Sequence, residues 1–320
     1  MSSIAVKLIS YLKKVYRADC CEHGWRTYCR RGTDIWCLNG RRTGIESLVA
    51  RNQPHFVAFM ADPFIFHCKG TNWIFYETVG PECVDSGLKG KIGCLKDCGG
   101  HWENVGVVLD LPWHLSYPQV FEEEGHVYMI PEQSALGQGD VSIYEAVDFP
   151  HKWIKRKTLI AKSFADSTLL VHNGHYYLAC YMIPPHESAE LWHAPALMGP
   201  WTRHPASGNI LQDAKYRRCG GRFLSENGQI YRVAQDCEGG YGIRLYKIPI
   251  RKISSTEYEE GEPELLLDEF AIIRSRKHTY NTLVADGVQI EVFDCHWFTQ
   301  CPFLIIVQNL FRKIVRRLSR

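Results

Sequence analysis

Asp62 and Asp166 hold the same place in a short phrase that recurs along the chain. Each lies eight residues before a turn glycine, Gly70 and Gly174 respectively. Two carboxyl groups that meet at one site can act as acid, base or nucleophile on a glycosidic bond, whose transition state resembles an oxocarbenium ion. An Asp before Pro or Ser can also cap its own turn. The shared position favours the functional interpretation and predicts that both carboxyls face one central site.

Glycosyl chemistry needs a further acidic group, and three carboxyls are candidates. Glu132 ends the second copy of the phrase, Glu187 lies in the loop PPHESAE, and Asp236 follows the fourth copy. A general acid must lie within reach of the leaving oxygen. The spacing does not decide among the three. We take Glu132 as the third catalytic candidate, beside the two aspartates.

Basic and aromatic residues in or beside the same phrases are candidate substrate contacts. Cationic side chains there could hold a phosphate or carboxylate on a sugar. Rings of the WHLSYP loop could stack on a sugar face. A lone His or Arg is more often structural, so the argument depends on the group. The predicted substrate-binding residues are Trp113, His114, Tyr117, Arg218, Arg222, Arg232, Asp236 and His278.

The cysteine and glycine patterns give no sign of a metal or a cofactor. The 13 cysteines follow no repeating spacing and include no Cys-x-x-Cys pair, which favours reduced thiols packed as small hydrophobic residues. The paired glycines at 99–100, 220–221 and 239–240 do not open a helix, as a phosphate-binding loop would require. We therefore predict neither a metal nor a cofactor.

The phrase that carries the two aspartates occurs five times and fits a β-hairpin each time. The turn glycines are separated by 55, 49, 54 and 59 residues, a period typical of propeller blades. Asn-Gly and Asp-Gly pairs at three of the turns tolerate positive φ. Further strand-like stretches follow the first four copies, which gives four strands per repeat. The copies span residues 61–77, 116–132, 165–181, 219–235 and 278–294.

These repeats predict an all-β, five-bladed β-propeller over residues 22–295. The fifth hairpin is followed by only about one more element, so the last blade lacks its outer strands. The N-terminal stretch GWRTYCRRG has strand composition and can complete that blade, which would close the ring. A two-sheet sandwich is the alternative for short strands between turns. Five copies of one phrase argue against it.

Residues 1–21 and 296–320 are predicted to form short amphipathic helices. The first segment lacks the continuous apolar run of a signal peptide, so we expect a cytoplasmic protein. The second combines an apolar stripe with five cations in residues 312–320. That helix could lie on anionic lipid at the inner face of a membrane, or pack on protein. The formal net charge of +2 argues against a nucleic-acid partner.

Six phrases together resemble a known family: ADPFIF, HLSYPQVFEEEGHVYMIPE, ADSTLL, RVAQDC, YGIRLYKI and HTYN. They are similar to the propeller at the N-terminus of plant glucosamine inositolphosphorylceramide transferase and in bacterial polysaccharide-biosynthesis proteins. The similarity covers roughly residues 22–294. It extends at fold level to the five-bladed propellers of glycoside hydrolase families 43, 32 and 68. In those hydrolases a first-blade Asp is the base, which implies that role for Asp62.

The resemblance implies a carbohydrate-active propeller in surface polysaccharide or glycolipid biosynthesis, either a glycosyltransferase or a partner of one. The plant protein carries its transferase activity in a separate domain, so catalysis by this chain stays open. A glycoside hydrolase using the axial carboxylates and a non-catalytic glycan-binding or scaffolding propeller are the alternatives. The expected ligand is a sugar or glycan, anionic or nucleotide-linked. An anionic membrane surface is the second expected partner.

Overall fold

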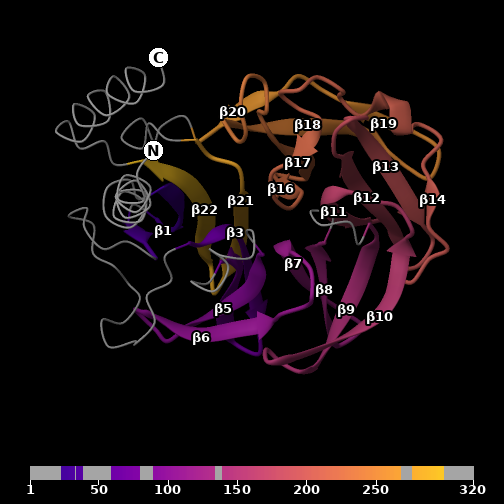
Figure 1. The fold of residues 1–320 in the computed structure, drawn as a ribbon. Helices are drawn as coiled ribbons and strands as arrows, with labels where there is room; N and C mark the ends of the chain where they lie inside the picture. The colour runs from indigo at the N-terminus through magenta and orange to yellow at the C-terminus, as the bar shows by residue number, and fades with distance from the viewer. Residues whose placement is uncertain are drawn as a thin grey trace, which may run out of the picture. The chain divides into compact units, whose positions relative to one another are not determined.

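The computed structural model describes residues 23–32, 34–38, 59–79, 89–133, 139–267 and 276–298, of which Trp25–Cys295 belong to one compact unit. Within this unit, five antiparallel sheets surround a common centre (Figure 1). The predicted all-β, five-bladed propeller is confirmed. The helices predicted in residues 1–21 and 296–320 lie outside the described residues, except that residues 296–298 extend a strand.

The first three blades each contain four strands in chain order, with the first strand nearest the centre (Figure 1). Strand bounds are as follows. Blade 1 contains β3 (Ala61–Cys68), β4 (Thr71–Thr78), β5 (Lys91–Asp97) and β6 (Trp102–Leu109). Blade 2 contains β7 (Ser116–Glu123), β8 (His126–Glu132), β9 (Val141–Asp148) and β10 (Lys152–Ile160). Blade 3 contains β11 (Ala165–His172), β12 (His175–Met182), β13 (Ser188–Ala194) and β14 (Thr202–Arg203).

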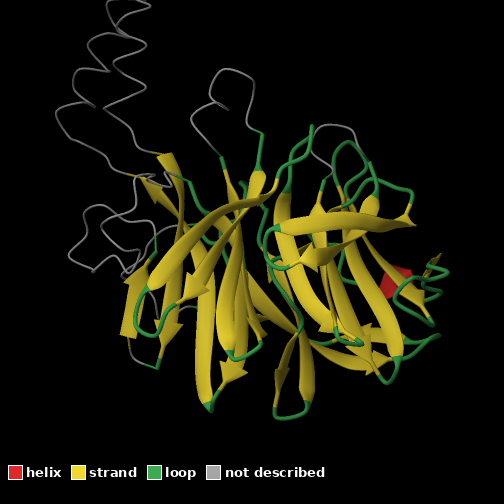
Figure 2. Cartoon of the chain, turned by 90° about the horizontal axis from the view of Figure 1, so that it is seen from below, coloured by secondary structure: helices red, strands yellow, loops and turns green. Residues whose placement is uncertain are grey.

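Blade 4 has six strands where the first three blades have four, and blade 5 combines strands from both ends of the propeller sequence. Blade 4 contains β15 (Arg218–Cys219), β16 (Leu224–Glu226), β17 (Gln229–Gln235), β18 (Leu245–Ile253), β19 (Tyr258–Glu260) and β20 (Glu264–Leu266). Blade 5 has the order β2-β1-β22-β21, from β21 (Tyr280–Ala285), β22 (Val288–Phe298), β1 (His23–Arg31) and β2 (Asp34–Cys37). The N-terminal stretch therefore completes the last blade, as predicted. Strands make up almost all the regular structure (Figure 2).

The inner hairpins turn where the glycine period predicts. At each turn two successive residues have positive φ, the combination required by the type I′ turns that match strand twist. Asn173 and Gly174 have φ of 49° and 70°, and Asp286 and Gly287 have 51° and 74°. Two turns place Lys69 or Glu124 before the glycine instead, at φ of 49° and 51°. Glycine at the second position is therefore the residue that all five turns share.

The core consists of five hydrophobic clusters, each of which joins neighbouring blades. Phe75 of blade 1 and Trp153 of blade 2, for example, meet edge to face at 5.9 Å in one cluster. Tyr28 of the N-terminal strand stacks on Phe293 of β22 at 5.6 Å within blade 5. Burying one such ring stabilises the fold by roughly 1.5–3 kcal/mol. Because blade 5 also packs on blade 1, the ring of blades is closed.

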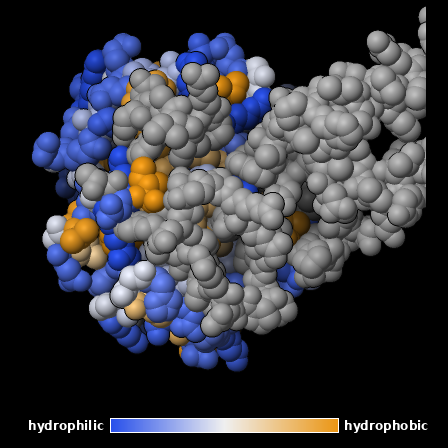
Figure 3. Space-filling model, turned by 90° about the vertical axis from the view of Figure 1, so that its left-hand side faces the viewer, coloured by the Kyte–Doolittle hydropathy of each residue, from blue (hydrophilic) through white to orange (hydrophobic). Residues whose placement is uncertain are grey.

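The described surface is largely hydrophilic on the face drawn in Figure 3, with hydrophobic residues in small separate groups. Large exposed hydrophobic side chains such as Val107 and Val284 are scattered over different blades, an arrangement normal for folded proteins. None of the described residues forms a helix long and apolar enough to cross a bilayer.

Three histidines meet where blade 3 borders blade 4. His175 Nε2 lies 3.3 Å from His193 Nδ1, and the rings of His193 and His204 are 4.8 Å apart. His204 Nε2 contacts the Ser254 carbonyl at 2.7 Å, while its Nδ1 accepts the Ala206 amide hydrogen. His204 is therefore a neutral ring with its proton on Nε2. Burial, then repulsion from His204 and His175, lowers the pKa of His193. Burial also lowers the pKa of His204, against the opposing hydrogen bond to Ser254 and with a smaller contribution from His175.

We expect the folded state to lose stability as the pH falls below the ordinary histidine value of 6.5, because the unfolded chain binds protons that the folded cluster resists. His193→Asn keeps a polar group near the Nδ1 position and removes one titration. The fall in melting temperature between pH 7.5 and 5 should be smaller in this variant than in the parent, measured by calorimetry. A control at an exposed histidine, His151→Asn, should leave the slope unchanged. An equal slope in the parent and both variants would contradict the interpretation.

Candidate functional site

Three of the innermost strands begin with a bulge at the axis. The bulged residues Asp62, Tyr117 and Asp166 have φ of 48°, 47° and 47°, and the pairing register shifts beside each one. Positive φ in a non-glycine residue is unfavourable unless surrounding contacts hold it. Here each bulged amide donates to a carboxylate: Asp62 N to Asp294 Oδ2 at 2.9 Å, Tyr117 N to Asp62 Oδ2 at 3.2 Å, and Asp166 N to Glu132 Oε2 at 3.0 Å.

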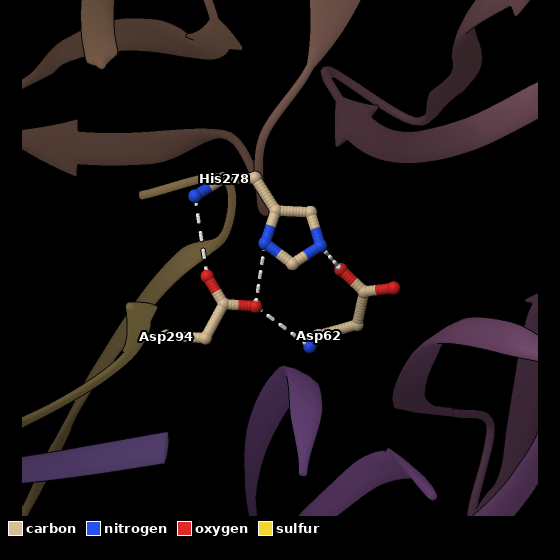
Figure 4. A group of neighbouring side chains, drawn as sticks. All are labelled: Asp62, His278 and Asp294. Atoms are coloured by element: carbon tan, nitrogen blue, oxygen red, sulfur yellow. Dashed lines mark hydrogen bonds and ion pairs between the residues drawn. The ribbon is translucent and has the colours of Figure 1, made fainter. Parts of the chain in front are cut away.

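Asp294 fastens the last blade to the first. It is completely buried within β22, and its Oδ2 accepts the amide of Asp62 from blade 1. Its Oδ1 accepts the amides of Thr279 at 2.9 Å and His278 at 3.2 Å (Figure 4). One carboxylate thus satisfies three buried amides across the junction where the ring closes.

His278 lies between the carboxylates of Asp62 and Asp294 (Figure 4). Its Nε2 is 3.1 Å from Asp62 Oδ1, and its Nδ1 is 2.8 Å from Asp294 Oδ2. Burial opposes the charged ring, but the two carboxylates outweigh it and raise the pKa of His278 well above its usual value. For Asp62, burial is likewise outweighed, by His278 and Thr279, so its pKa is lowered.

The same three residues could in principle hold a metal ion. One ligand atom from each of Asp62, His278 and Asp294 lies within 4.8 Å of the others. Both imidazole nitrogens, however, already face carboxylate oxygens. A protonated His278 supplies the positive charge that these carboxylates need, and the group is satisfied by its own members.

Asp166 belongs to a second acidic group on the axis. Its Oδ2 accepts hydrogen bonds from Arg218 Nε and from Gln235 Nε2, the latter at 2.8 Å. The Asp166 amide donates to Glu132 Oε2 at 3.0 Å, so the two acidic side chains are neighbours. Burial raises the pKa of Asp166 well above its usual value, with Glu132 adding to the effect and Arg218 opposing it. The structure therefore brings two of the predicted catalytic carboxyls together.

Aromatic residues frame this end of the axis. The Arg218 guanidinium lies 5.2 Å from the centre of the Tyr181 ring and 4.9 Å from that of Tyr241. Tyr241 is 39% exposed and meets the Trp25 ring edge to face at 6.0 Å. Trp25 in turn packs on His278, with centroids 3.9 Å apart. The loop that carries Tyr241 needs Gly242, because a Cβ there would lie 2.7 Å from the Cβ of His278.

Glu77 is a further carboxyl of the axial group, and the sequence analysis did not predict it. It is the next-to-last residue of β4, and its Oε1 lies 3.5 Å from His114 Nε2. Burial, followed by repulsion from Asp62, raises its pKa well above the usual value, and Glu132 and Asp294 add to the shift. A signal was present: the residues seven positions after the turn glycines hold equivalent places in the second strand of each hairpin. They are Glu77, Glu132, Tyr181, Gln235 and Asp294, all buried.

The remaining predicted residues have local partners. Tyr117 is fully buried, with its hydroxyl against Thr168 at 2.9 Å, so its ring offers no face to a sugar. Trp113 donates from Nε1 to Gln133 at 3.1 Å beside the axial group. Asp236 caps its own turn by accepting the Glu238 amide at 2.9 Å. Glu187, one alternative acid, is paired with Arg217.

The two other arginines bind protein groups away from the acidic cluster. Arg222 donates to the main-chain carbonyls of Ile65 and Val120, which ties blade 4 to blades 1 and 2. Burial lowers its pKa to about 10. Arg232 forms a buried bidentate pair with Glu260 on the outer strand β19, at 2.5 and 3.0 Å. The structure therefore groups Asp62, Asp166, Glu132, His278, Arg218 and His114, and places Arg222 and Arg232 elsewhere.

Comparison with known proteins identifies relatives of this arrangement. Residues 44–300 match the family described as "Glucosamine inositolphosphorylceramide transferase 1, N-terminal". Glucosamine inositolphosphorylceramide transferase 1 of Arabidopsis thaliana is 32% identical over 274 residues, which cover 80% of this chain and 34% of that protein. The protein of the same name from Oryza sativa subsp. japonica is 35% identical over 221 residues, covering 66% of this chain and 29% of that protein. The chain thus spans about a third of these relatives' length.

Solved structures share the fold. The GH43 enzyme of Xanthomonas citri, complexed with xylotriose, has a TM-score of 0.52 at 14% identity, covering 74% of this chain and 86% of that chain. The GH32 β-fructofuranosidase of Bombyx mori has a TM-score of 0.51 at 12% identity, covering 72% and 54%. A family 117 glycoside hydrolase of Zobellia galactanivorans has a TM-score of 0.51 at 15% identity, covering 76% and 87%. These confirm the expected fold-level similarity, and at such identity they show the fold alone.

Asp294→Ala tests the closing carboxylate. The change leaves three buried amides without an acceptor and His278 with one counter-ion, so we expect a loss on the order of 3–5 kcal/mol in the free energy of unfolding. Urea denaturation checks it. Asp148→Ala, at an exposed aspartate of β9, should change stability by no more than about 0.5 kcal/mol. Comparable losses in both variants would show that the position of the carboxylate is immaterial.

Glu77→Gln should stabilise the protein in a pH-dependent way. A carboxyl whose folded pKa is raised disfavours folding as the pH rises above its unfolded value of about 4.5. The amide cannot ionise, so the variant should melt higher than the parent at pH 7.5 and the difference should shrink towards pH 4.5. Calorimetry at both pH values measures this. Glu226→Gln, in β16 of blade 4, is the control. A melting temperature of Glu77→Gln below that of the parent at pH 7.5 would refute the raised pKa of Glu77.

Proposed function

Because the chain belongs to the family of the glucosamine inositolphosphorylceramide transferase 1 N-terminal domain, we propose that its propeller binds the sugar portion of a glycolipid and serves glycosyl transfer to that lipid. The relatives are named glucosamine inositolphosphorylceramide transferases. The matched region is about a third of their length, so binding is the part of the activity that we assign to this domain. The proposed peripheral location at an anionic membrane agrees with a lipid-linked ligand.

The observation that carries this proposal is the occupancy of the axial carboxylates. Asp62 Oδ1 faces Thr279 and His278, and its Oδ2 accepts the amide of Tyr117. Asp62 is also only 3% exposed. A catalytic base or nucleophile needs a free oxygen within hydrogen-bond reach of its target. Asp62 instead has its oxygens occupied by groups that hold the blades together, which favours binding over hydrolysis.

The groups nearer the surface are suited to recognition. Arg218 holds Asp166 through Nε, and its terminal nitrogens make no hydrogen bond to the described residues. Its side chain is 16% exposed, and Tyr241 beside it is 39% exposed. Guanidinium donors flanked by aromatic rings can bind sugar hydroxyls or a phosphate while the rings cover the apolar face of the sugar. A glycolipid headgroup offers both kinds of surface.

Hydrolysis is a second candidate, favoured by Asp166, whose pKa is raised well above its usual value by burial and by the neighbouring Glu132. A buried acid that keeps its proton near neutral pH is the usual form of a general acid in glycosidases. The pair of Asp166 and Glu132 could donate a proton to a leaving oxygen if a ligand displaced one of their hydrogen-bond partners. The two functions differ in one outcome, the release of a reducing sugar.

Arg218→Lys separates ligand binding from the fold. Lysine keeps the charge opposite Asp166 but loses the planar set of donors, so we expect at least about tenfold weaker binding of the sugar that stabilises the parent most in a thermal-shift panel of glycolipid headgroups and oligosaccharides. Arg203→Lys, on the outer strand of blade 3, should bind like the parent. Release of a reducing sugar by the parent, lost in Asp166→Asn, would favour the hydrolase instead. Equal binding by Arg218→Lys would reject the assigned site.

A further inference from the structure

Arg222 extends from blade 4 into the centre of the ring of blades. It lies between β15 and β16, where the innermost strand of this blade is interrupted. Its Nη1 donates to the Ile65 carbonyl at 2.7 Å, and its Nη2 donates to the Val120 carbonyl. These carbonyls belong to β3 and β7, the innermost strands of blades 1 and 2, and neither blade is a neighbour of blade 4 (Figure 1). The guanidinium therefore places a positive charge at the centre.

The backbone around Arg222 fixes this direction. Gly221 has φ of 142°, and a Cβ there would lie 1.8 Å from the Tyr280 carbonyl oxygen, so only glycine lets the chain pass this close to blade 5. The Gly221 amide donates to the Tyr117 hydroxyl at 2.6 Å, and the Arg222 amide donates to Asn281 Oδ1 at 2.8 Å. Both acceptor side chains are completely buried. The fold thus holds the arginine in this position.

The charge of Arg222 is not balanced by the protein. Both acceptors of its guanidinium are uncharged carbonyls. Burial lowers the pKa of Arg222 to about 10, and no carboxylate opposes the effect. Arg232, in the same blade, is buried as well but pairs with the Glu260 carboxylate. A buried charge without a counter-ion costs free energy, so Arg222 differs from its neighbour in needing one.

The free hydrogen-bonding capacity here belongs to the guanidinium itself. Of its five N–H groups, two bind carbonyls and the other three donate to none of the described residues. The side chain is half-buried, so part of it is accessible. Gln119 and Asn281, which join the same innermost strands, donate their side-chain amides to the carbonyls of Leu169 and Pro63.

These features suit a small monovalent anion. Water could accept hydrogen bonds from the three N–H groups, but it would leave the charge of Arg222 unbalanced. A divalent anion would bring a second negative charge for which this part of the ring has no cation. A halide accepts several N–H groups at once and carries one negative charge, which matches the guanidinium.

We propose that the centre of the ring binds a small monovalent anion, with chloride as the expected ion, and that Arg222 is its main ligand. The anion would balance the charge that blade 4 inserts between blades 1 and 2, so it is expected to stabilise the folded protein. No bond is formed or broken. The site is separate from the axial carboxyls, and the proposal does not depend on the proposed function.

Melting curves of the full chain test the proposal at pH 7.5 and a constant sodium concentration of about 200 mM, with chloride replacing methanesulfonate. A ligand that binds only the folded state raises the melting temperature, so we expect a saturating rise of at least about 2 °C. Arg222→Gln removes the charge and should not respond to chloride. Arg203→Gln, at an exposed arginine of β14, should respond like the parent.

Crystals of the parent grown in sodium bromide locate the ion directly, whether or not Arg222→Gln folds. An anomalous peak is expected within about 4 Å of an Arg222 guanidinium nitrogen, the distance of an ion pair. Bromide found at the surface alone would be an adventitious ion only and would overturn the proposal. Equal melting in the two salts, or a chloride response that Arg222→Gln retains, would overturn it too. A response lost in Arg218→Lys and kept in Arg222→Gln would assign the anion to the axial group instead.

Discussion

The structure depends on the backbone amides of the bulged residues at the start of the innermost strands. No paired strand supplies a hydrogen-bond acceptor for these amides. Buried backbone amides are almost always hydrogen-bonded. Carboxylates fill the need: Asp294 for the amide of Asp62, Asp62 for that of Tyr117, and Glu132 for that of Asp166. In all three bonds the carboxylate and the amide belong to neighbouring blades, so these bonds couple the blades directly.

This constraint explains why so many carboxyls lie in so small a space. Buried carboxylates repel one another and resist losing water, so each needs a proton or a cation. The protein supplies His278 to one group and Arg218 to the other, and burial beside Glu132 raises the pKa of Asp166 despite Arg218. The pKa of Glu77 is raised by burial and by repulsion from Asp62, Glu132 and Asp294. The electrostatics of the site therefore follow from the way in which the ring is closed.

The same residues limit what the site can do. A carboxylate that holds the backbone is poorly placed to accept a proton from a substrate, and Asp62 is of this kind. Arg218, Glu77 and Tyr241 have spare hydrogen-bonding capacity or exposed surface. The fold is shared with glycoside hydrolases, but fold does not assign chemistry. Family membership and the occupied axial carboxylates together favour a domain that recognises a glycan for glycosyl transfer.

The sequence alone determined the blade count, the hairpins and the place of Asp62 and Asp166, because turn glycines and strand alternation are local patterns. It also indicated that the N-terminal stretch completes the last blade. Which side chains contact one another was decided only by the tertiary structure. Asp62 and Asp294 are 232 positions apart, and Arg232 meets Glu260 on an outer strand rather than a ligand. Side-chain types show what a residue can bind, whereas closure of the ring decides which groups are near enough to be bound.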